Sequence, residues 1–258
     1  MSETLEQVGL VARRSVRRTL RQPALIIPTI VFPLLLLAIN SSGLSSATKV
    51  PGLPASSYLD FAITVCFMQG ALFAAITAGT ELATDIESGF LDRLQLTPLR
   101  PVAVLIGQMA GAAALSLLAT VVYIVAGLIG GATIRAGVGG CFVLVALSML
   151  VSMSMAGIGS LMASRTGRAE AVQGLFPLLF VTLFLSSANF PRNLMSVTWF
   201  RDIATYNPVS YLVEGMRSLI ITGWDSTALL KGFGFALLIA ALSFLAAARG
   251  LRTRMART

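Results

Sequence analysis

Hydrophobic positions along the chain form six long apolar stretches separated by shorter polar segments. They lie near residues 24–41, 59–83, 102–130, 138–162, 171–189 and 229–247. An α-helix of about 20 apolar residues crosses a hydrocarbon core of about 30 Å, because each residue adds about 1.5 Å. The pattern therefore predicts an all-α integral membrane protein with six transmembrane helices, in a single transmembrane domain covering residues 1–258.

Residues 4–22 precede the first apolar stretch and have an amphipathic pattern. Apolar residues recur at helical spacing, and arginines cover the rest of the circumference: Leu5, Val8, Ala12, Val16 and Leu20 against Arg13, Arg14, Arg17, Arg18 and Arg21. The pattern predicts a helix on the membrane surface, whose arginines extend toward the anionic inner leaflet. The alternative is an ordinary positively charged flank of the first span.

Residues 190–228, between the fifth and sixth stretches, are too long for a turn and rich in aromatic residues. Within this segment, Asn207 and Pro208 are typical of a helix start, and Gly223 is typical of a helix end. A helix over residues 208–222 would measure about 22 Å, which is short of a complete crossing. We therefore expect re-entrant or interfacial outer helices before the last span.

Composition and charge agree with a membrane protein and orient it. Hydrophobic residues make up 56% of the chain, charged residues 12%, and the net charge is +8. In a membrane protein such a basic balance reports the cytoplasmic loops rather than a nucleic-acid partner. Most arginines lie in the N-terminal segment, the loops around 84–100 and 165–168, and the C-terminal segment. The positive-inside rule then places both termini in the cytoplasm.

Several kinds of chemistry are excluded by the residues themselves. The chain has no histidine, which excludes histidine-based catalysis and most zinc sites. Its only lysines are Lys49 and Lys231, and neither follows the glycine-rich turn of a phosphate-binding loop. No Gly-x-Ser-x-Gly motif is present. We therefore expect no catalytic residue, no metal site and no cofactor in this chain, so that any ATP and magnesium would bind to a partner.

Acidic residues mark the inner end of the second stretch. Glu81 and Asp85 are one helical turn apart, so both carboxylates lie on one face of the helix. A charge at the bilayer centre costs about 2.5 to 3.5 kcal/mol on insertion scales. We therefore expect both carboxylates to face water at the cytoplasmic boundary.

The loop at residues 84–100 contains a short amphipathic helix. Phe90, Leu91 and Leu94 form its apolar edge, and Thr97 before Pro98 disfavours further α-helix. An exposed apolar edge of this kind fits a cleft on a partner. The alternative is a surface helix that only turns the chain.

Two sequence segments carry a family resemblance. The segment ESGFLDRLQLTPLRP, residues 87–101, resembles the first cytoplasmic loop of permease subunits of type-2 ABC exporters, the group that includes daunorubicin-resistance permeases and polysaccharide exporters. The segment YNPVSYLVEGMRSLI, residues 206–220, is similar to the part of such permeases just before the last span. The order of the predicted elements agrees over nearly the whole chain. The first external loop, 42–58, is short and polar, so no large external domain is expected for substrate capture.

The resemblance implies roles for particular residues. The cytoplasmic loop would be a coupling helix that docks on an ATPase subunit, with its interface formed by Glu87, Gly89, Phe90, Leu91, Arg93, Leu94, Thr97 and Pro98. The outer segment would shape a gate, with Asn207, Pro208, Tyr211, Glu214 and Arg217. Two ATPase copies and a second permease copy or paralogue would complete the assembly. Gly107 and Gly111 are a candidate contact between permease copies, because small residues let membrane helices approach closely.

The expected function is that of a permease subunit of an ATP-driven exporter in the bacterial inner membrane. Its substrate pathway would be largely apolar, with candidates on the second and fifth spans: Phe67, Met68, Phe176, Phe180 and Phe184. An apolar pathway suits a hydrophobic drug-like or lipid-like substrate taken from the membrane lipid. The alternatives are a polysaccharide or lipid-linked glycan exporter, and a subunit that serves as a sensor or in assembly without transporting.

Overall fold

A computed structural model describes residues 2–44, 55, 57–95 and 101–255, and all regular structure within these ranges is helical. The helices are α1 Ser2–Leu20, α2 Pro23–Gly43, α3 Tyr58–Glu87, α4 Phe90–Gln95, α5 Pro101–Ile129, α6 Gly137–Thr166, α7 Ala169–Gln173, α8 Leu175–Phe184, α9 Thr198–Tyr206, α10 Pro208–Ile221 and α11 Ser226–Met255, with a short 3-10 helix at Arg192–Leu194. The all-α prediction is confirmed for these residues.

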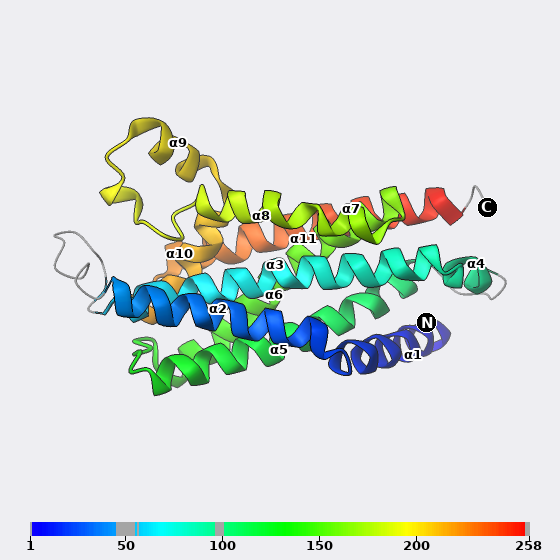
Figure 1. Cartoon of the computed structure of the whole chain (residues 1–258), viewed down its shortest axis with the longest axis horizontal. Coiled ribbons are helices and arrows are strands. Elements are labelled where there is room, and N and C mark those ends of the chain that lie inside the picture. Colours follow the sequence, from blue (N-terminus) through cyan, green and yellow to red (C-terminus); the bar gives the residue numbers. More distant parts are fainter. Residues whose placement is uncertain (1, 45–54, 56, 96–100, 256–258) are drawn as a thin grey trace.

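The long helices lie side by side along the longest axis of the molecule (Figure 1). Helices α1 and α4 lie at one end together with the C-terminal end of α11, and α9 and α10 lie at the other end (Figure 1). Helix α3 is central: 83% of the residues in its most apolar stretch are buried, compared with 17% in α2 and α11. The outer helices therefore present most of their apolar surface to the surroundings, as expected in lipid.

Five helices in the described part of the chain are long and apolar enough to cross a membrane. They are Pro23–Gly43, Tyr58–Glu87, Val102–Ile129, Gly137–Thr166 and Ser226–Arg254. They correspond to the first four predicted spans and to the last one. Helices α3 and α11 are longer than predicted, because polar residues extend them beyond the apolar stretches.

The fifth predicted span, residues 171–189, differs from the expectation of one continuous helix. It consists of α7 and the ten-residue helix α8, which are separated at Gly174. Pro177 cannot donate the hydrogen bond to the carbonyl four residues earlier, and glycine is a weak helix former. Both residues therefore favour a break at this position, and hydropathy alone does not detect it.

Glycines allow α3 and α6 to approach closely. A Cβ atom added at Gly159 would lie 1.8 Å from the carbonyl oxygen of Ala75, and one added at Gly79 would lie 2.7 Å from the carbonyl oxygen of Gly159. These backbone oxygens cannot rotate away, so only glycine fits at these positions. This contact holds the central helix α3 closely against α6.

The helix expected over residues 208–222 is present as α10, Pro208–Ile221. The Asn207 side chain accepts a hydrogen bond from the Val209 backbone N–H at 3.0 Å, and Pro208 is the first helical residue. The helix start is therefore formed as the sequence predicts.

Candidate functional site

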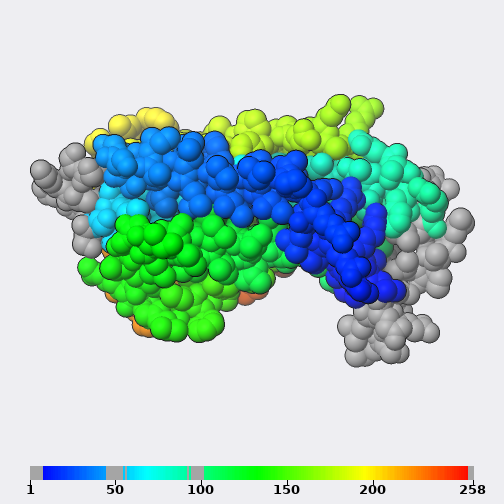
Figure 2. Space-filling model, turned by 60° about the horizontal axis from the view of Figure 1, so that its bottom comes forward, coloured from blue at the N-terminus to red at the C-terminus, as the bar shows by residue number. Residues whose placement is uncertain are grey.

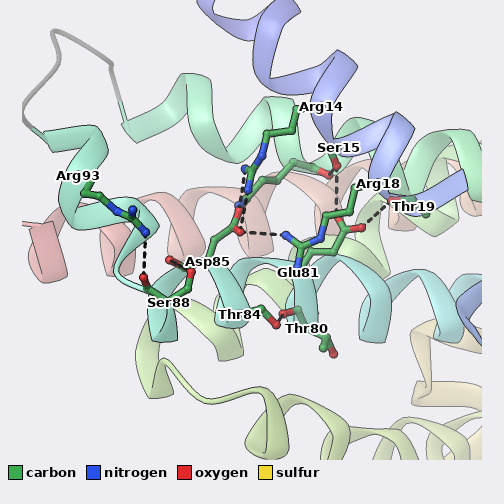
Figure 3. A network of polar contacts seen from close by, with 11 residues as sticks. Arg14, Ser15, Arg18, Thr19, Thr80, Glu81, Thr84, Asp85, Ser88 and Arg93 are labelled. Carbon is green, nitrogen blue, oxygen red and sulfur yellow. Dashed lines mark hydrogen bonds and ion pairs between the residues drawn. The ribbon is translucent and has the colours of Figure 1, made fainter. Parts of the chain in front are cut away.

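Helix α1 packs against α5, and its polar side chains reach the C-terminal part of α3 (Figure 3). Figure 2 shows α1 in dark blue, next to α2 and lying against the rest of the molecule. Glu81 and Asp85 are only 4% and 3% exposed. The expectation that both carboxylates face water is therefore wrong, because hydropathy gave no indication that side chains of α1 and α5 enclose them.

Asp85 is bound by side chains from two other helices (Figure 3). Arg14 donates to its two carboxylate oxygens at 3.1 and 3.2 Å, and Arg18 donates to Oδ1 at 2.9 Å. Gln108 of α5 donates to Oδ2 at 2.7 Å. Hydrogen bonds to an ionised group are stronger than those between neutral groups. Asp85 therefore joins α1, α3 and α5.

Glu81 is held by hydroxyl groups rather than by a direct ion pair. The Ser15 hydroxyl is 3.1 Å from Oε2, and the Thr19 hydroxyl donates to Oε1 at 2.6 Å. Ser15 Oγ also lies 2.8 Å from the backbone carbonyl oxygen of Gln108. The Arg14 and Arg18 guanidiniums offset the charge of the Asp85 carboxylate, which reduces the cost of burying that carboxylate.

The buried face of α1 is polar, which the amphipathic pattern did not predict. Ser15 and Thr19 are 5% and 0% exposed, whereas Leu20, assigned to the apolar face, is 44% exposed. A Cβ atom at Gly111 would lie 2.4 Å from both hydroxyl oxygens, and one at Gly107 would lie 2.5 Å from Val11. The Gly-x-x-x-Gly motif thus packs α1 within the chain, and the expectation that it joins two permease copies is wrong for this conformation.

The predicted coupling helix is α4, which begins three residues after the end of α3 and so lies close to Asp85 in the sequence. Gly89 turns the chain with a φ of 66°, a conformation that favours glycine. Arg93 is exposed, and its guanidinium donates to the backbone carbonyls of Ser88 and Gly89 at 3.2 and 3.4 Å. The Arg14 guanidinium lies 3.9 Å from the centre of the Phe90 ring. One arginine of α1 therefore contacts both Asp85 of α3 and Phe90 of α4.

The other predicted coupling residues have different surroundings. Leu91 is 3% exposed and packs in the same buried cluster as Leu82 and Val104, so it does not extend the exposed apolar edge. Glu87 is exposed and accepts a hydrogen bond from the Ala169 backbone N–H at 3.0 Å, which joins the end of α3 to α7. The Leu94 side chain, Thr97 and Pro98 lie outside the described residues.

At the opposite end, Asn207 and Arg217 bind carbonyl groups in the last turn of α8 and just after it. The last carbonyls of a helix have no partner within the helix. Asn207 Nδ2 donates to the carbonyls of Thr182 and Leu185 at 2.7 and 3.1 Å. The buried Arg217 guanidinium donates to those of Ser187 and Ala188 at 2.8 and 2.6 Å. Two residues assigned to the outer gate therefore attach α10 to the end of α8.

The remaining outer residues form a second contact. Glu214 pairs with Arg192, with Nε 2.8 Å from Oε1 and Nη2 2.9 Å from Oε2. Arg192 also lies 4.5 Å from the centre of the Tyr211 ring, and that ring stacks on Phe235 of α11 with centroids 4.6 Å apart. The sequence analysis missed Arg192, because a single arginine in an irregular segment gives no periodic signal.

Three of the predicted pathway residues form a row along α8. The ring centroids of Phe176 and Phe180 are 5.4 Å apart, and those of Phe180 and Phe184 are 5.2 Å apart. Phe73 of α3 contacts Phe176 at 5.2 Å, and Phe32 of α2 contacts Phe180 at 6.2 Å. The structure thus adds two rings to the predicted set, from the predicted first and second spans.

Phe67 and Met68 are not part of this row. They are 3% and 0% exposed, and the Phe67 ring contacts Tyr123 of α5 with centroids 5.9 Å apart. In this conformation both side chains pack within the protein. A cavity of about 470 Å³ lies next to Phe184, between α2, α3 and the segment that follows α8.

The long apolar helices of this bundle are those of a multi-pass membrane protein. The chain belongs to the ABC-2 type transporter family, whose pattern matches residues 6–221. Members of this family are the transmembrane subunits of ABC transporters, and membership implies a partner ABC ATPase. The chain is therefore a membrane permease subunit of an ABC transporter, as the resemblance in the sequence indicates.

Curated relatives agree with this assignment. The chain is 26% identical over 228 residues to a transport permease named ycf38 of Porphyra purpurea, which covers 87% of this chain and 78% of the relative. It is 24% identical over 221 residues to a protein of Mycobacterium tuberculosis named as the doxorubicin resistance ABC transporter permease DrrC, covering 84% and 78%.

Proposed function

We propose that this chain is the permease subunit of an ATP-driven exporter that moves a hydrophobic drug-like or lipid-like substrate out of the bacterial cell. The energy comes from a separate ATPase subunit, which binds ATP and Mg²⁺. The observation that carries the proposal is the double contact of Arg14, with Asp85 in α3 and with the Phe90 ring in α4. A movement of α4 by a bound ATPase would reach the central helix through this contact.

The proposed topology has six crossings and both termini in the cytoplasm. The path through α7 and α8 runs from the end that carries α4 toward the end that carries α9 (Figure 1). Together with the hydrogen-bonded segment after α8, it connects the inner end of α6 to the outer helices. The arginines of α1, α4 and the α6–α7 connection then lie on one side, as the positive-inside rule requires.

The proposed substrate class follows from the side chains near α8. The aromatic row leads along α8 to the cavity, and Phe184 belongs to both. Aromatic rings in a row offer an apolar surface to a hydrophobic molecule that arrives from the membrane. One relative is named for resistance to doxorubicin, which favours a drug-like substrate for the group.

The proposed assembly holds two permease copies, or this chain and a paralogue, and two ATPase subunits. A single copy provides one row of aromatic side chains on the outside of its bundle. Phe184 is 50% exposed, and Val181 is 52% exposed on the same helix. A second copy that faces α2 and α8 would enclose this surface and complete a pathway.

Co-purification with an ABC ATPase from the same organism tests the coupling role. We expect wild-type permease to retain the ATPase, and Arg93→Glu to reduce both the retained ATPase and ATP-driven efflux about tenfold or more. Arg201→Glu is the matched control, because Arg201 is an exposed arginine on α9 at the opposite end. The proposal is wrong if wild-type permease retains no ATPase, or if Arg93→Glu behaves like Arg201→Glu in both measurements.

A further inference from the structure

The cavity next to Phe184 has largely apolar walls, and one buried polar atom of its lining has no hydrogen-bond partner among the described residues. Its walls include aromatic rings from three parts of the chain: Tyr58 and Phe61 from α3, Phe184 from α8, and Phe190 and Phe200 from the segment that follows. Gln69 of α3 also lines the cavity and is 4% exposed. Its Oε1 atom is buried and accepts no hydrogen bond from the residues that the structure describes.

A buried polar atom without a partner is unusual in a folded protein. Most other buried polar side chains in this bundle are paired, such as Ser116 with Ser152 at 2.6 Å. Gln69 differs because it adjoins a space of about 470 Å³, which is within the size range of small-molecule sites. A largely apolar site with a few hydrogen-bonding groups fixes the orientation of a ligand and selects for its partner groups. Asn40, Tyr58 and Asn189 also line the cavity, but only Gln69 among these four is buried.

The charges around the cavity restrict the ligand further. No acidic or basic residue lines the cavity among the described residues. Behind its wall, the buried Arg217 guanidinium lies 3.8 Å from the centre of the Phe61 ring. Arg217 has hydrogen bonds to two carbonyls, and no carboxylate of the described residues lies within ion-pair distance of it, so the wall carries a positive charge that opposes a cation.

We infer that this cavity is a binding site for an uncharged aromatic molecule that donates a hydrogen bond to Gln69 Oε1. The inference rests on the proposed function, because it treats the cavity as a station for the exported substrate. Lipid acyl chains do not satisfy the polar atom, since they have no donor. Gln69 is then the residue that determines specificity at this site.

The test uses full-length permease co-expressed with its ATPase and purified in detergent. The probes are 1-hydroxypyrene, 1-methoxypyrene and the cationic 1-pyrenemethylamine, which share one ring system. Binding to the folded state raises the unfolding temperature, and the dependence on probe concentration gives an apparent Kd. We expect 1-hydroxypyrene to bind wild type about tenfold more tightly than either of the other probes, the size of one good hydrogen bond.

Two variants locate the interaction. Gln69→Met keeps the approximate shape but loses the acceptor, so 1-hydroxypyrene should bind it about tenfold more weakly, while 1-methoxypyrene is unaffected. Thr64→Val is the matched control, since Thr64 is also buried on α3 with an unpaired hydroxyl oxygen but does not line the cavity. This variant should bind all three probes like wild type.

Three results overturn the inference. The first is no stabilisation of wild type by 1-hydroxypyrene, as expected if a second copy of the chain or a lipid fills the cavity. The second is equal affinity for 1-hydroxypyrene and 1-methoxypyrene, and the third is an equal loss in Thr64→Val. Failure of the proposed coupling is separate, because it appears as no ATPase retained by wild type, or as Arg93→Glu behaving like Arg201→Glu, whatever the probes do.

Discussion

The contacts of the buried Asp85 carboxylate stabilise the bundle only when all of its partners are present. Asp85 accepts hydrogen bonds from Arg14, Arg18 and Gln108, and each of these donors comes from a helix other than α3. Removing one partner from a buried charged group leaves the others without compensation, so the loss exceeds the net value of the contact. The side chains of Arg14 and Arg18 remain 43% and 27% exposed, which limits that loss.

We expect Asp85→Asn to destabilise the permease by about 1 to 3 kcal/mol, the range for hydrogen bonds to charged groups. The two arginines would then face each other without their carboxylate. Thermal unfolding of the purified protein measures the effect, with Asp202→Asn as the control, because Asp202 is exposed on α9. Equal unfolding temperatures for the two variants would contradict a stabilising role for the contacts of Asp85 with Arg14, Arg18 and Gln108.

The contacts of Glu81 and Asp85 could be predicted only in part from the sequence. The spacing of Glu81 and Asp85 on one helical face was visible in the sequence. Their partners were not, because Arg14 is separated from Asp85 by 71 residues and resembled an ordinary arginine at a membrane surface. Asn207 is the opposite case, since its capping role depends only on the next two residues.

At the scale of elements, small residues determine how closely the helices pack. The contact between α3 and α6 depends on Gly159, where an added Cβ atom meets a backbone oxygen rather than a side chain. A side chain could rotate away, but a backbone oxygen moves only with its helix. Long apolar helices were predictable from hydropathy, whereas this separation depends on which glycines face each other. The break at Gly174 was missed because it depends on single glycine and proline residues, which do not change the hydropathy of the stretch.

Gly159→Ala is therefore expected to lower stability by about 3 kcal/mol or more, at the upper end of the cost of overpacking. Gly234→Ala in α11 is the matched control, because no atom lies within 4 Å of the added Cβ atom. Alanine there should be neutral or stabilise by up to about 1 kcal/mol, since it is the better helix former. Thermal unfolding compares the two variants, and a similar loss in both would show that α3 and α6 are not in close contact.

The attachment of α10 to α8 gives a second prediction for elements. Arg217→Lys keeps the charge but loses the planar fork that binds two carbonyls together. We expect hydrogen exchange to increase about tenfold or more at the backbone amides of residues 186–189, which lie beside these carbonyls, and to stay unchanged in α6. Arg201→Lys is the control on the exposed face of α9. Unchanged exchange in Arg217→Lys would mean that the two hydrogen bonds do not hold this segment.

For the whole molecule, the number of crossings depends on the short helices α7 and α8. Residues 169–184 form the one shorter apolar segment among the described helices. If this segment crosses the membrane together with the residues that follow it, Arg168 and Asp202 lie on opposite sides. If it does not cross, they lie on the same side, and the two termini are separated by the membrane.

Cysteine labelling separates these two arrangements. In a Cys66→Ser, Cys141→Ser background, which removes both free thiols, single cysteines are placed at Arg168, Asp202 and Arg249, all exposed. We expect a membrane-impermeant maleimide to label Asp202→Cys in intact cells, and to label Arg168→Cys and Arg249→Cys only after permeabilisation. Retained drug efflux in each variant confirms that the protein is folded. Labelling of Arg168→Cys and Asp202→Cys from the same side would exclude six crossings. The cavity at Gln69 would then not belong to a complete outward pathway.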